Sequence, residues 1–549
     1  MISYGLDLGT SNCLVAKVEE KLDGSFEVKC LNDDEGNESF PSIVYFEDEN
    51  NYKVGSLAEN KLYIYPDSTV ELVKIRLGKT TEIPIIINGN IINKSPQEIS
   101  AYLLRHFNKL HNNQIKSALI TVPAFFDQTQ KDATMQAGIA AGMRIEGLIE
   151  EPTAAIMYHL FDQYVKKGIE WFSSDAHKNI LVFDFGGGTL DLSLIKVCYA
   201  NGAITPEVLE IGGDPELGGN IIDFIFTDLV LQNIANEYVN DKFIQEVKIA
   251  FENYYINYLD HKILKFSEDV SIDVKQYIFR LKRNIEQAKI KLSTEKSVKI
   301  SFEGIYKPII VTREDFEEEV LGDSKLSIKT RIADVLKGIS KKRLPISQVI
   351  LIGGSSQIPY VRELIFNVFS SIGGITKEKI IHSDDFNKAV AKGAAIQAAL
   401  KNGTIIPPFA QNKCNSIVSR DIEIYHAGKS SVFIPKGTEY PFLEKKEFAI
   451  KVGHALNDRI DLCFNEIIEK EKVEKKEICQ FSFFLPLYYT NDQIMLSMDI
   501  NDAGLYQIGA MHTNTMESVE FEPTKRFSLS EAELNELVEN LKGKKDISK

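Results

Sequence analysis

The chain has 549 residues, which is too many for one hydrophobic core and predicts several domains. Hydrophobic residues make up 44% and charged residues 26%, the proportions of an ordinary soluble globular protein. The net charge is −15, from 63 Lys and Arg against 78 Asp and Glu. This acidity argues against general nucleic-acid binding, whose affinity comes largely from basic side chains that meet phosphates.

The sequence lacks the usual signals for export or for a membrane anchor. Residues 1–7 include no basic segment and run straight into patterned sequence, and no apolar stretch approaches membrane-spanning length. The six cysteines are scattered without a C-x-x-C motif, which suits buried thiols in a reduced compartment better than a disulfide framework. We therefore expect a cytoplasmic protein with neither a membrane nor a nucleic acid as partner.

Two segments share the same strand–turn–strand sequence pattern. A strand predicted at 2–8 runs into the turn 7–12, Asp-Leu-Gly-Thr-Ser-Asn, and then into a second strand. Much later, a strand predicted at 179–183 runs into 184–191, Asp-Phe-Gly-Gly-Gly-Thr-Leu-Asp, and again into a second strand. Each is a hairpin whose small-residue turn is permissive enough to touch a ligand closely. The repeat predicts two homologous lobes that face one cleft.

Strands alternate with helices between and after these hairpins. A strand is predicted at 118–123 and a helix at 127–141, with an Asp placed to cap its first turn. A strand predicted at 349–352 leads into Gly-Gly-Ser-Ser at 353–356, and an Ala-rich helix is predicted at 389–400. This alternation predicts a mixed or parallel sheet, and hence an α/β fold.

The composition changes near residue 402. Asn402-Gly403 and Pro407-Pro408 indicate a linker, and short alternating segments beyond it predict an antiparallel β domain. The predicted division is a first domain at 1–402, a linker at 403–411, a β domain at 412–527, and a helix with a tail at 528–549.

The last segment combines a helix signal with a basic end. Ser530 and Glu533 form a capping-box pattern for a helix that runs to Leu541. The Lys-rich residues 542–549 are expected to form a solvated, frayed tail. Elsewhere, His106 is expected to be a surface or packing residue and not a ligand.

Asp7 and Asp184 each end the first strand of a hairpin. Two carboxylates would repel a polyphosphate on their own, so they make sense in one cleft only if cations lie between. Mg²⁺ keeps several waters and is often held by one or two carboxylates plus substrate phosphates. The Gly, Thr and Ser residues of the turns supply backbone N–H groups for an anion-binding nest. Lys74 and Glu151 can complete such a site by charge stabilisation and by positioning a water.

These residues resemble a family, the heat-shock protein 70 or DnaK-type chaperones. The matching segments span nearly all of residues 1–402 in order, at 5–12, 73–78, 121–126, 151–155, 183–191, 217–219, 352–359 and 389–399. The resemblance implies an α/β, two-lobed actin-like (ribonuclease H-like) ATPase domain. A β-sandwich-like substrate-binding domain and a short C-terminal helix, a truncated lid, would follow it.

The resemblance implies ATP or ADP and Mg²⁺ as cofactors, with K⁺ as a further candidate cation. The residues that would contact the phosphates are Gly9, Thr10, Ser11, Asn12, Gly186, Gly187, Gly188 and Thr189. Asp7 and Asp184 would hold Mg²⁺ through waters, and Asp191 would contribute to cation binding. Lys74, Glu151, Asp184 and Thr189 would serve phosphate cleavage. The residues that would enclose the nucleoside are Gly218, Gly219, Glu286, Lys289, Ser293, Gly353, Gly354 and Ser355.

Two departures from the family pattern concern the base. The family usually has Arg at the positions of Ile290 and Gln357. Those guanidinium groups pack on adenine, a stacking that neither Ile nor Gln reproduces, although Ile can still pack apolarly on the ring. We therefore expect weaker or less selective nucleotide binding, not its loss.

Other departures concern the link to the β domain. The family linker is acidic and leucine-rich, whereas 404–410 reads Thr-Ile-Ile-Pro-Pro-Phe-Ala. The peptide-gripping motif is poorly kept, since 418–423 reads Val-Ser-Arg-Asp-Ile-Glu where Leu-Gly is usual. Coupling between ATP state and peptide affinity needs an element that both sites bias, and these changes fall on that element. Residues 527–541 resemble the start of the helical lid, so a bound peptide should exchange quickly.

The leading hypothesis is a monomeric, ATP-driven chaperone that binds and releases unfolded or specific client polypeptides. A J-domain co-chaperone and a nucleotide exchange factor would be its implied partners. The alternative is a regulatory or scaffold protein that uses nucleotide as a switch and binds one folded partner without gripping peptides. A sugar or acetate kinase of the same fold is a third hypothesis, which the β domain and the motif at 151–155 do not fit.

Overall fold

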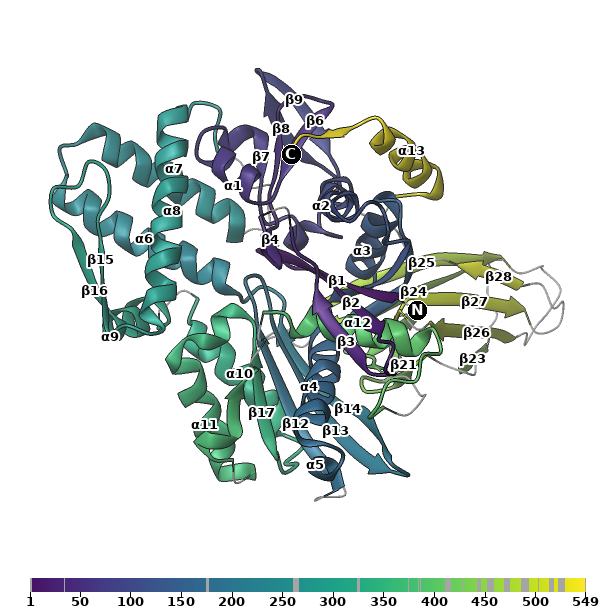
Figure 1. The fold of residues 1–549 in the computed structure, drawn as a ribbon. Helices are drawn as coiled ribbons and strands as arrows, with labels where there is room; N and C mark the ends of the chain where they lie inside the picture. The colour runs from purple at the N-terminus through teal and green to yellow at the C-terminus, as the bar shows by residue number, and fades with distance from the viewer. Residues whose placement is uncertain are drawn as a thin grey trace.

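The structure, a computed structural model, describes residues 2–548 with the exception of 34, 174–176, 260–265, 323–325, 374, 384, 386, 410–415, 427, 442–445, 452–458, 469–473, 485–492, 502, 513–517 and 522–528. Helices and strands alternate as far as α12 (Ala389–Lys401), and strands dominate the chain after it (Figure 1). The predicted mixed α/β class is confirmed for the first part of the chain.

Two mixed sheets have the same design. The first has the strand order β11-β10-β1-β2-β3 and the second the order β14-β13-β12-β17-β18. In each sheet an antiparallel hairpin, β1 with β2 or β12 with β13, continues on its other side into two parallel strands. The bounds in the first sheet are Ile2–Leu8 (β1), Asn12–Glu20 (β2), Phe26–Cys30 (β3), Ser117–Val122 (β10) and Arg144–Glu150 (β11). In the second they are His177–Phe185 (β12), Leu190–Ala200 (β13), Ala203–Asp214 (β14), Gln348–Ile352 (β17) and Ile380–His382 (β18).

Two helices join the sheets. Helix α4 (Glu151–Lys167) follows β11 directly, and α12 approaches it so closely that a Cβ on Gly393 would lie 1.6 Å from the carbonyl oxygen of Ala154. Helix α12 also packs against β1, where a Cβ on Gly5 would lie 2.3 Å from the backbone nitrogen of Ala395. Apolar side chains of both helices share one core with side chains of both sheets. This core fixes how far apart the two hairpin turns lie.

The remaining helices cover the outer faces of the two lobes. On the first lobe these are α2 (Pro96–Leu110) and α3 (Gln128–Ala140), and Asp127 caps α3 through a capping box with Gln130, as its position predicted. On the second lobe they are α6 (Gly219–Glu237), α7 (Lys242–Leu259), α8 (Ile272–Leu292), α10 (Ile328–Ser340) and α11 (Pro359–Gly373). A small sheet beside α2 has the order β29-β6-β5-β7, with bounds Val44–Phe46 (β5), Asn51–Val54 (β6), Thr69–Val70 (β7) and Lys545–Asp546 (β29).

The C-terminal part contains two four-stranded antiparallel sheets. Their orders are β21-β20-β24-β25 and β23-β26-β27-β28. The bounds are Ile422–His426 (β20), Lys429–Ile434 (β21), Arg459–Ile468 (β24) and Glu474–Phe484 (β25), then Lys446–Lys451 (β23), Gln493–Ile500 (β26), Tyr506–His512 (β27) and Ser518–Phe521 (β28). Ile422 and Phe464 of one sheet share a core with Leu496 and Ile508 of the other, so the two sheets pack on each other. The antiparallel β domain predicted from alternating segments is present.

The β domain lies against the first lobe. The Arg420 guanidinium donates to the carbonyl oxygen of Phe125 at 3.0 Å, and Lys476 forms an ion pair with Asp127. The backbone N–H of Tyr506 donates to Gln128 Oε1 at 3.2 Å. The linker contacts the second lobe, since the N–H of Ile204 donates to the carbonyl oxygen of Pro408 at 2.8 Å. The end of the predicted linker, residues 410 and 411, lies outside the described residues.

The predicted tail at 542–549 is solvated in part, since Lys542 and Lys545 are exposed, but the prediction that it is frayed is wrong. Helix α13 (Glu531–Lys542) begins at the predicted Ser530 capping box, but Leu541 is buried against the first lobe. The chain then continues as β29, which pairs in parallel with β6. The Lys-rich composition suggested a segment without backbone partners. In the structure, the N–H of Lys545 donates to the carbonyl oxygen of Asn50, and the N–H of Ile547 donates to that of Tyr52 in β6.

The closeness of α12 and α4 yields a stability prediction. Gly393→Ala will destabilise the protein by about 3 kcal/mol, because the added methyl group overlaps the backbone of α4 and the helices must separate. Gly338→Ala in α10 is the matched control, since a Cβ there meets no atom within 4 Å. Removing that helical glycine should stabilise by about 0.5–1 kcal/mol. Thermal denaturation measures both, and equal effects would contradict the packing described.

Candidate functional site

The two hairpin turns face each other across a cleft. The cleft holds a cavity of about 600 Å³ that is lined from both lobes. A Cβ on Gly187 would lie 2.3 Å from Ser11 Oγ, and a Cβ on Gly188 would lie 2.4 Å from Thr10 Oγ1. A side chain at either position would displace these hydroxyl groups, which explains two of the three glycines in the second turn. The tips of the two turns thus form one surface of backbone N–H and hydroxyl groups.

Four carboxylates and one lysine meet below the turns. Lys74 forms a buried ion pair with Glu151, the first residue of α4. Asp7 accepts a hydrogen bond from Thr121 Oγ1 at 2.9 Å. Asp184 and Asp191 are register partners on β12 and β13, and Asp191 Oδ1 accepts from the N–H of Phe125 at 3.3 Å. The hairpin pairing therefore places three aspartates beside the ion pair.

This excess of negative charge shifts the proton affinity of the aspartates. Burial, and then the charge of Glu151, raises the pKa of Asp7 to about 6 and that of Asp191 to about 7. The pKa of Asp184 is raised well above its ordinary value for the same reasons, in that order. Burial alone would lower the pKa of Lys74, but the charges of Glu151 and Asp7 outweigh it, so Lys74 keeps its proton.

The residues present fit a cation bound together with phosphates. Asp191 Oδ2 is buried and has no hydrogen-bond partner among the described residues, and the carboxylates outnumber the lysine. No group of three or more His, Cys, Asp or Glu in the described part of the chain could hold a metal by itself. A cation at this place would therefore depend on waters and on phosphate oxygens, which is the usual arrangement for Mg²⁺.

The cleft continues from the turns to α8 and to the Gly353–Gly354 turn. Ser355 Oγ donates to the carbonyl oxygen of Gly186 at 2.9 Å and ties this turn to the second hairpin. Lys289 Nζ donates to Asp223 at 2.6 Å and to the carbonyl oxygen of Gly219 at 3.3 Å. Ile290, which is 52% exposed, and Gln357 line the same end of the cavity.

Most residues predicted for the site line the cavity together. They are Asp7, Gly9, Thr10, Ser11, Asn12, Lys74, Glu151, Asp184, Gly186, Gly187, Gly188, Thr189, Gly219, Glu286, Lys289, Ser293, Gly353, Gly354 and Ser355. The other two predicted residues lie behind this lining. Asp191 is paired with Asp184, and a Cβ on Gly218 would lie 2.4 Å from the carbonyl oxygen of Gly187.

Among the cavity-lining residues that the sequence interpretation missed are Asn220, Asp223 and Asn387. Asn220 Nδ2 and Asp223 Oδ1 are buried without a hydrogen-bond partner among the described residues, so both have capacity for a ligand. Burial is the main cause that raises the pKa of Asp223 to about 6. The sequence could have indicated two of them. Asn220 directly follows the predicted site residue Gly219, and Asp223 lies one helical turn further along α6, on the same face.

Ion pairs across the cleft hold the lobes together. Three of them use basic side chains of α8: Lys275 contacts Asp67 at 2.8 Å, Lys282 contacts Glu71 at 2.7 Å, and Arg283 contacts Glu59 at 3.2 Å. A further pair joins Lys388, at the start of α12, to Glu38. Lys282 also lies over the ring of Phe224, at 4.7 Å from its centroid. The lobes are thus linked both by the α4–α12 core below the cleft and by these pairs beside it.

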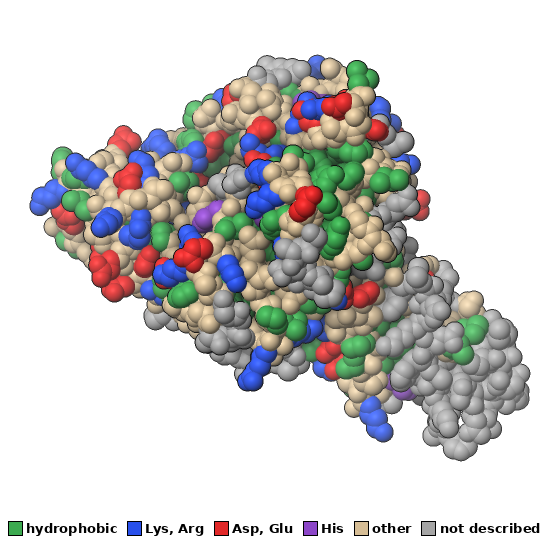
Figure 2. Space-filling view, turned by 60° about the horizontal axis from the view of Figure 1, so that its bottom comes forward, with side chains coloured by type: hydrophobic (Ala, Val, Ile, Leu, Met, Phe, Trp, Pro, Cys, Tyr) green, Lys and Arg blue, Asp and Glu red, His purple; other side chains and the backbone are tan. Residues whose placement is uncertain are grey.

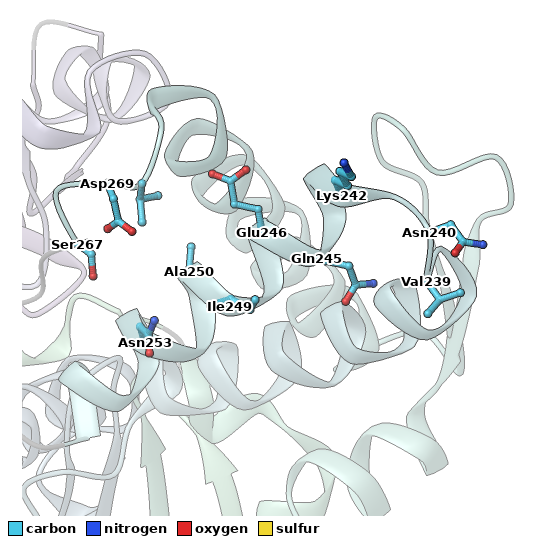
Figure 3. Close-up of a pocket in the computed structure, with 11 residues that line it drawn as sticks. Val239, Asn240, Lys242, Gln245, Glu246, Ile249, Ala250, Asn253, Ser267 and Asp269 are labelled. Atoms are coloured by element: carbon cyan, nitrogen blue, oxygen red, sulfur yellow. The ribbon is translucent and has the colours of Figure 1, made fainter.

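Another cavity lies away from these groups. It has a volume of about 390 Å³ and is lined by residues of α7, of the loop between α6 and α7, and of 267–270, as Figure 3 shows around Gln245 and Ile249. It shares no lining residue with the cleft, and its charged side chains, Lys242, Glu246 and Asp269, are exposed. We assign no chemistry to it. On the face drawn in Figure 2, the described basic and acidic side chains are intermixed and do not gather by sign.

Comparison with known proteins agrees with this geometry. The family model described as Hsp70 protein matches residues 3–250 and 249–547, and the chain belongs to this family. The chaperone protein DnaK of Thermotoga petrophila is 28% identical over 564 residues, which cover 98% of this chain and 83% of the relative. The chaperone protein DnaK of Mycoplasma mobile is 29% identical over 568 residues, covering 99% and 81%.

The membership carries general properties. The Hsp70 family implies an actin-like ATPase domain followed by a substrate-binding domain, and its members bind nucleotide with Mg²⁺. The family and the names of the relatives support chaperone and ATP-binding functions. Among the described helices, none combines the length and the apolarity needed to cross a membrane.

The charge imbalance in the cleft predicts a pH-dependent stability effect. With the pKa of Asp191 at about 7, its buried carboxylate is charged at pH 8 and opposes folding. Protonated Asp191 stabilises the folded state fully at pH values below the ordinary pKa of an aspartate. This stabilisation is lost as the pH rises through about 7, the pKa in the folded protein. Asp191→Asn will therefore raise the melting temperature of the nucleotide-free protein by several degrees at pH 8, and by less at pH 5.

Scanning fluorimetry at the two pH values measures this difference. Asp334→Asn is the control, because Asp334 is an exposed residue of α10 whose ion pair with Lys337 is also exposed. It should change the melting temperature little at either pH. An Asp191→Asn protein that is less stable than wild type at pH 8 would show that the carboxylate is not under repulsion.

Proposed function

We propose that the chain is an ATP-dependent chaperone that hydrolyses ATP in the cleft and couples this to binding and release of unfolded polypeptide segments. The observation that carries the proposal is the meeting of two like hairpin turns over a buried Lys74–Glu151 pair and three aspartates. Backbone N–H groups at such turns bind phosphate oxygens, and the carboxylates suit a hydrated Mg²⁺.

The residues take distinct roles in phosphate cleavage. Mg²⁺ would neutralise part of the phosphate charge, and Asp7 and Asp184 would hold it through waters, with Asp191 supporting them. Lys74 keeps its proton and donates to the phosphate that is cleaved. Glu151 orients Lys74 and positions the attacking water. The Thr189 hydroxyl contacts the same phosphate from the second turn. These groups raise the rate by position and charge.

A direct connection supports coupling to the β domain. Glu150, the residue before Glu151, is buried and accepts hydrogen bonds from Ser416 Oγ and the Tyr440 hydroxyl of the β domain. Lys131 lies 3.9 Å from the same carboxylate. Movement of the β domain would therefore pull on the residue next to the one that holds Lys74. The Glu150–Glu151 segment thus contacts both the β domain and the cleft, and coupling between two sites requires an element that both of them influence.

One observation favours the alternative, a nucleotide-switched scaffold that binds one folded partner. Arg420 lies in the segment whose counterpart grips peptides, yet it pairs with Glu466 at 2.9 Å and binds the backbone of Phe125. Its charge therefore serves domain docking.

In either case the chain acts as a monomer in the cytoplasm, and a J-domain co-chaperone and an exchange factor are the partners the family suggests.

Single-turnover ATP hydrolysis and release of a fluorescent peptide, measured on one preparation, test the proposal. Lys74→Ala and Thr189→Ala will each lower the hydrolysis rate by about 100-fold or more, because each removes a group that meets the developing charge. Lys29→Ala, an exposed residue of β3, is the control and should hydrolyse ATP normally.

The peptide measurement separates the two functions. ATP should speed peptide release from wild type and from Lys29→Ala. If ATP binds and is hydrolysed but leaves release unchanged, or if no peptide binds, the chaperone function fails and the scaffold is favoured. If hydrolysis is unaffected in both variants, the assignment of the cleft is wrong.

The nucleoside end of the cleft predicts weak selection of the base. Gln357 and Asn387 line it, and a neutral amide can present either its donor or its acceptor to a purine. GTP will therefore compete for the cleft within about tenfold of ATP, since rejection of an analogue needs fixed polar groups left unpaired. Competition against a fluorescent ADP analogue measures both affinities.

Ile290→Arg adds a guanidinium that can stack on the base and should tighten ATP binding by about 3-fold to 20-fold. Ile310→Arg is the matched control, because Ile310 is 68% exposed and lies on β16 (Ile309–Thr312), away from the cavity. Wild-type discrimination against GTP of more than about 100-fold would contradict the prediction of a permissive pocket.

A further inference from the structure

The segment that carries Lys74 lies between the two lobes. It follows strand β7 and includes a short 3-10 helix, Lys74–Arg76. Val73 is buried in the core of the first lobe. Leu72 is buried in the core cluster that is built mainly from helices of the second lobe, and Ile75 packs against the same cluster. Neighbouring side chains of one short segment thus belong to different cores, and Lys74 stands where these cores meet.

The backbone turns at Leu72 in a conformation that a leucine rarely adopts. Its φ is +58°, in the left-handed region, where the Cβ of an L-residue crowds the following carbonyl oxygen. Such a conformation costs free energy and persists only where the surroundings fix it. Because Leu72 is two residues before Lys74, a change of the backbone angle at Leu72 would redirect the chain that leads to Lys74. The position of Lys74 therefore depends on what holds this turn.

A lysine of the second lobe holds the residue before the turn. Lys282 Nζ of α8 donates to Glu71 Oε1 at 2.7 Å, and the two side chains are 11% and 19% exposed. Burial alone would lower the pKa of Lys282, but the charge of Glu71 outweighs it, so Lys282 keeps its proton. The contact is therefore a charged hydrogen bond that joins α8 to the start of the turn.

Aromatic rings surround the charged end of Lys282. Its Nζ lies 4.7 Å from the ring centroid of Phe224, 5.1 Å from that of Phe279 and 5.7 Å from that of Tyr254, three rings here called the aromatic box. Tyr258 of α7 stacks on Phe224, with centroids 4.4 Å apart. A cation over the face of a ring is attracted by the ring quadrupole, more strongly where water is excluded. The box therefore fixes where the ammonium group sits, and the carboxylate of the first lobe comes to it.

Another ion pair of α8 holds the same lobe without touching the turn. Lys275 contacts Asp67 at 2.8 Å, and its side chain is as buried as that of Lys282. Asp67 belongs to the 3-10 helix before β7, five residues from Leu72. The two pairs are thus alike in length and in the burial of the lysine, and they differ in whether the contact adjoins the strained residue.

We propose that the Glu71–Lys282 pair, seated in the aromatic box, holds the left-handed turn at Leu72 and thereby positions Lys74 for phosphate cleavage. The proposal rests on the proposed function, in which Lys74 donates to the phosphate that is cleaved. Glu71 and Lys282 do not line the nucleotide cavity, so they are positioning residues. When the pair is broken, the turn relaxes towards an ordinary φ and Lys74 moves with it. The second lobe thus sets the place of a residue that the first lobe supplies.

Hydrogen exchange of the nucleotide-free full chain tests the turn itself. The N–H of Leu77 donates to the carbonyl oxygen of Lys74 at 3.2 Å, so its exchange rate reports on the 3-10 helix. Lys282→Met keeps a long side chain in the aromatic box and removes the charge. It should speed exchange at Leu77 by about tenfold or more, because local opening no longer breaks the pair. Lys275→Met, the matched control, should change this rate by less than about twofold.

Single-turnover ATP hydrolysis and ATP affinity, measured on the same proteins, test the consequence. Lys282→Met should lower the hydrolysis rate by about 10-fold to 100-fold, which is the effect of a misplaced catalytic group. It should change ATP affinity by less than about threefold, because the lining of the cavity is unaltered. Lys282→Arg keeps a cation in the aromatic box and should retain at least about a third of the wild-type rate.

A second set of variants keeps the test valid if Lys282→Met does not fold. Glu71→Gln breaks the same contact from the first lobe and should reproduce both effects. Asp67→Asn removes the carboxylate that Lys275 contacts and should match wild type in exchange at Leu77 and in hydrolysis. Thermal denaturation shows which variants are folded at the assay temperature.

The outcomes are distinct. If Lys282→Met and Glu71→Gln keep the wild-type hydrolysis rate, with or without faster exchange at Leu77, the pair does not position Lys74. The proposal also fails if Lys275→Met loses as much activity as Lys282→Met, because the effect then comes from contact between the lobes in general. Lys74→Ala, measured beside these variants, separates such results from a failure of the proposed function. If it hydrolyses ATP as wild type does, the proposed function fails, and exchange at Leu77 still decides whether the pair holds the turn.

Discussion

The rest of the structure depends on burying several carboxylates in one place. Asp7, Asp184 and Asp191 stand beside Glu151 with Lys74 as the one cation among them, and the repulsion raises the proton affinity of the aspartates. Such an arrangement opposes folding and persists only because the surroundings hold it rigidly. The two like sheets, the glycine contact between α4 and α12, and the ion pairs of α8 are what hold it.

The same arrangement explains how a distant domain reaches the chemistry. Glu150 ends β11 and Glu151 begins α4, so one side chain points to the β domain and the next points into the cleft. The β domain approaches this junction from one side, with Tyr440 and Arg420 as its contacts. Helix α13 and strand β29 bind the same lobe from another side. Docking is therefore distributed over contacts that do not share residues with the cleft.

The departures from the family pattern acquire physical meaning in this setting. Ile290 and Gln357 lie at the nucleoside end of the cavity, where they change what the pocket selects and leave the phosphate end intact. Arg420 replaces a residue expected in a peptide-gripping segment and instead binds the first lobe. The altered segments thus change binding specificity and docking, while the groups suited to phosphate chemistry stay together.

Sequence alone determined the parts of this protein whose signals are local. Asp-x-Gly turns after apolar strands predicted the two hairpins, because a turn's chemistry lies within a few residues, whereas the nucleoside end of the cleft was predicted only through the resemblance to a known family. Tertiary structure decided what depends on residues far apart. Asn220 and Asp223 became site residues through the packing of α6. The Lys-rich tail became a paired strand because β6 offered an unpaired edge and His106 offered a partner for Asp546. Composition cannot reveal a partner that lies hundreds of residues away.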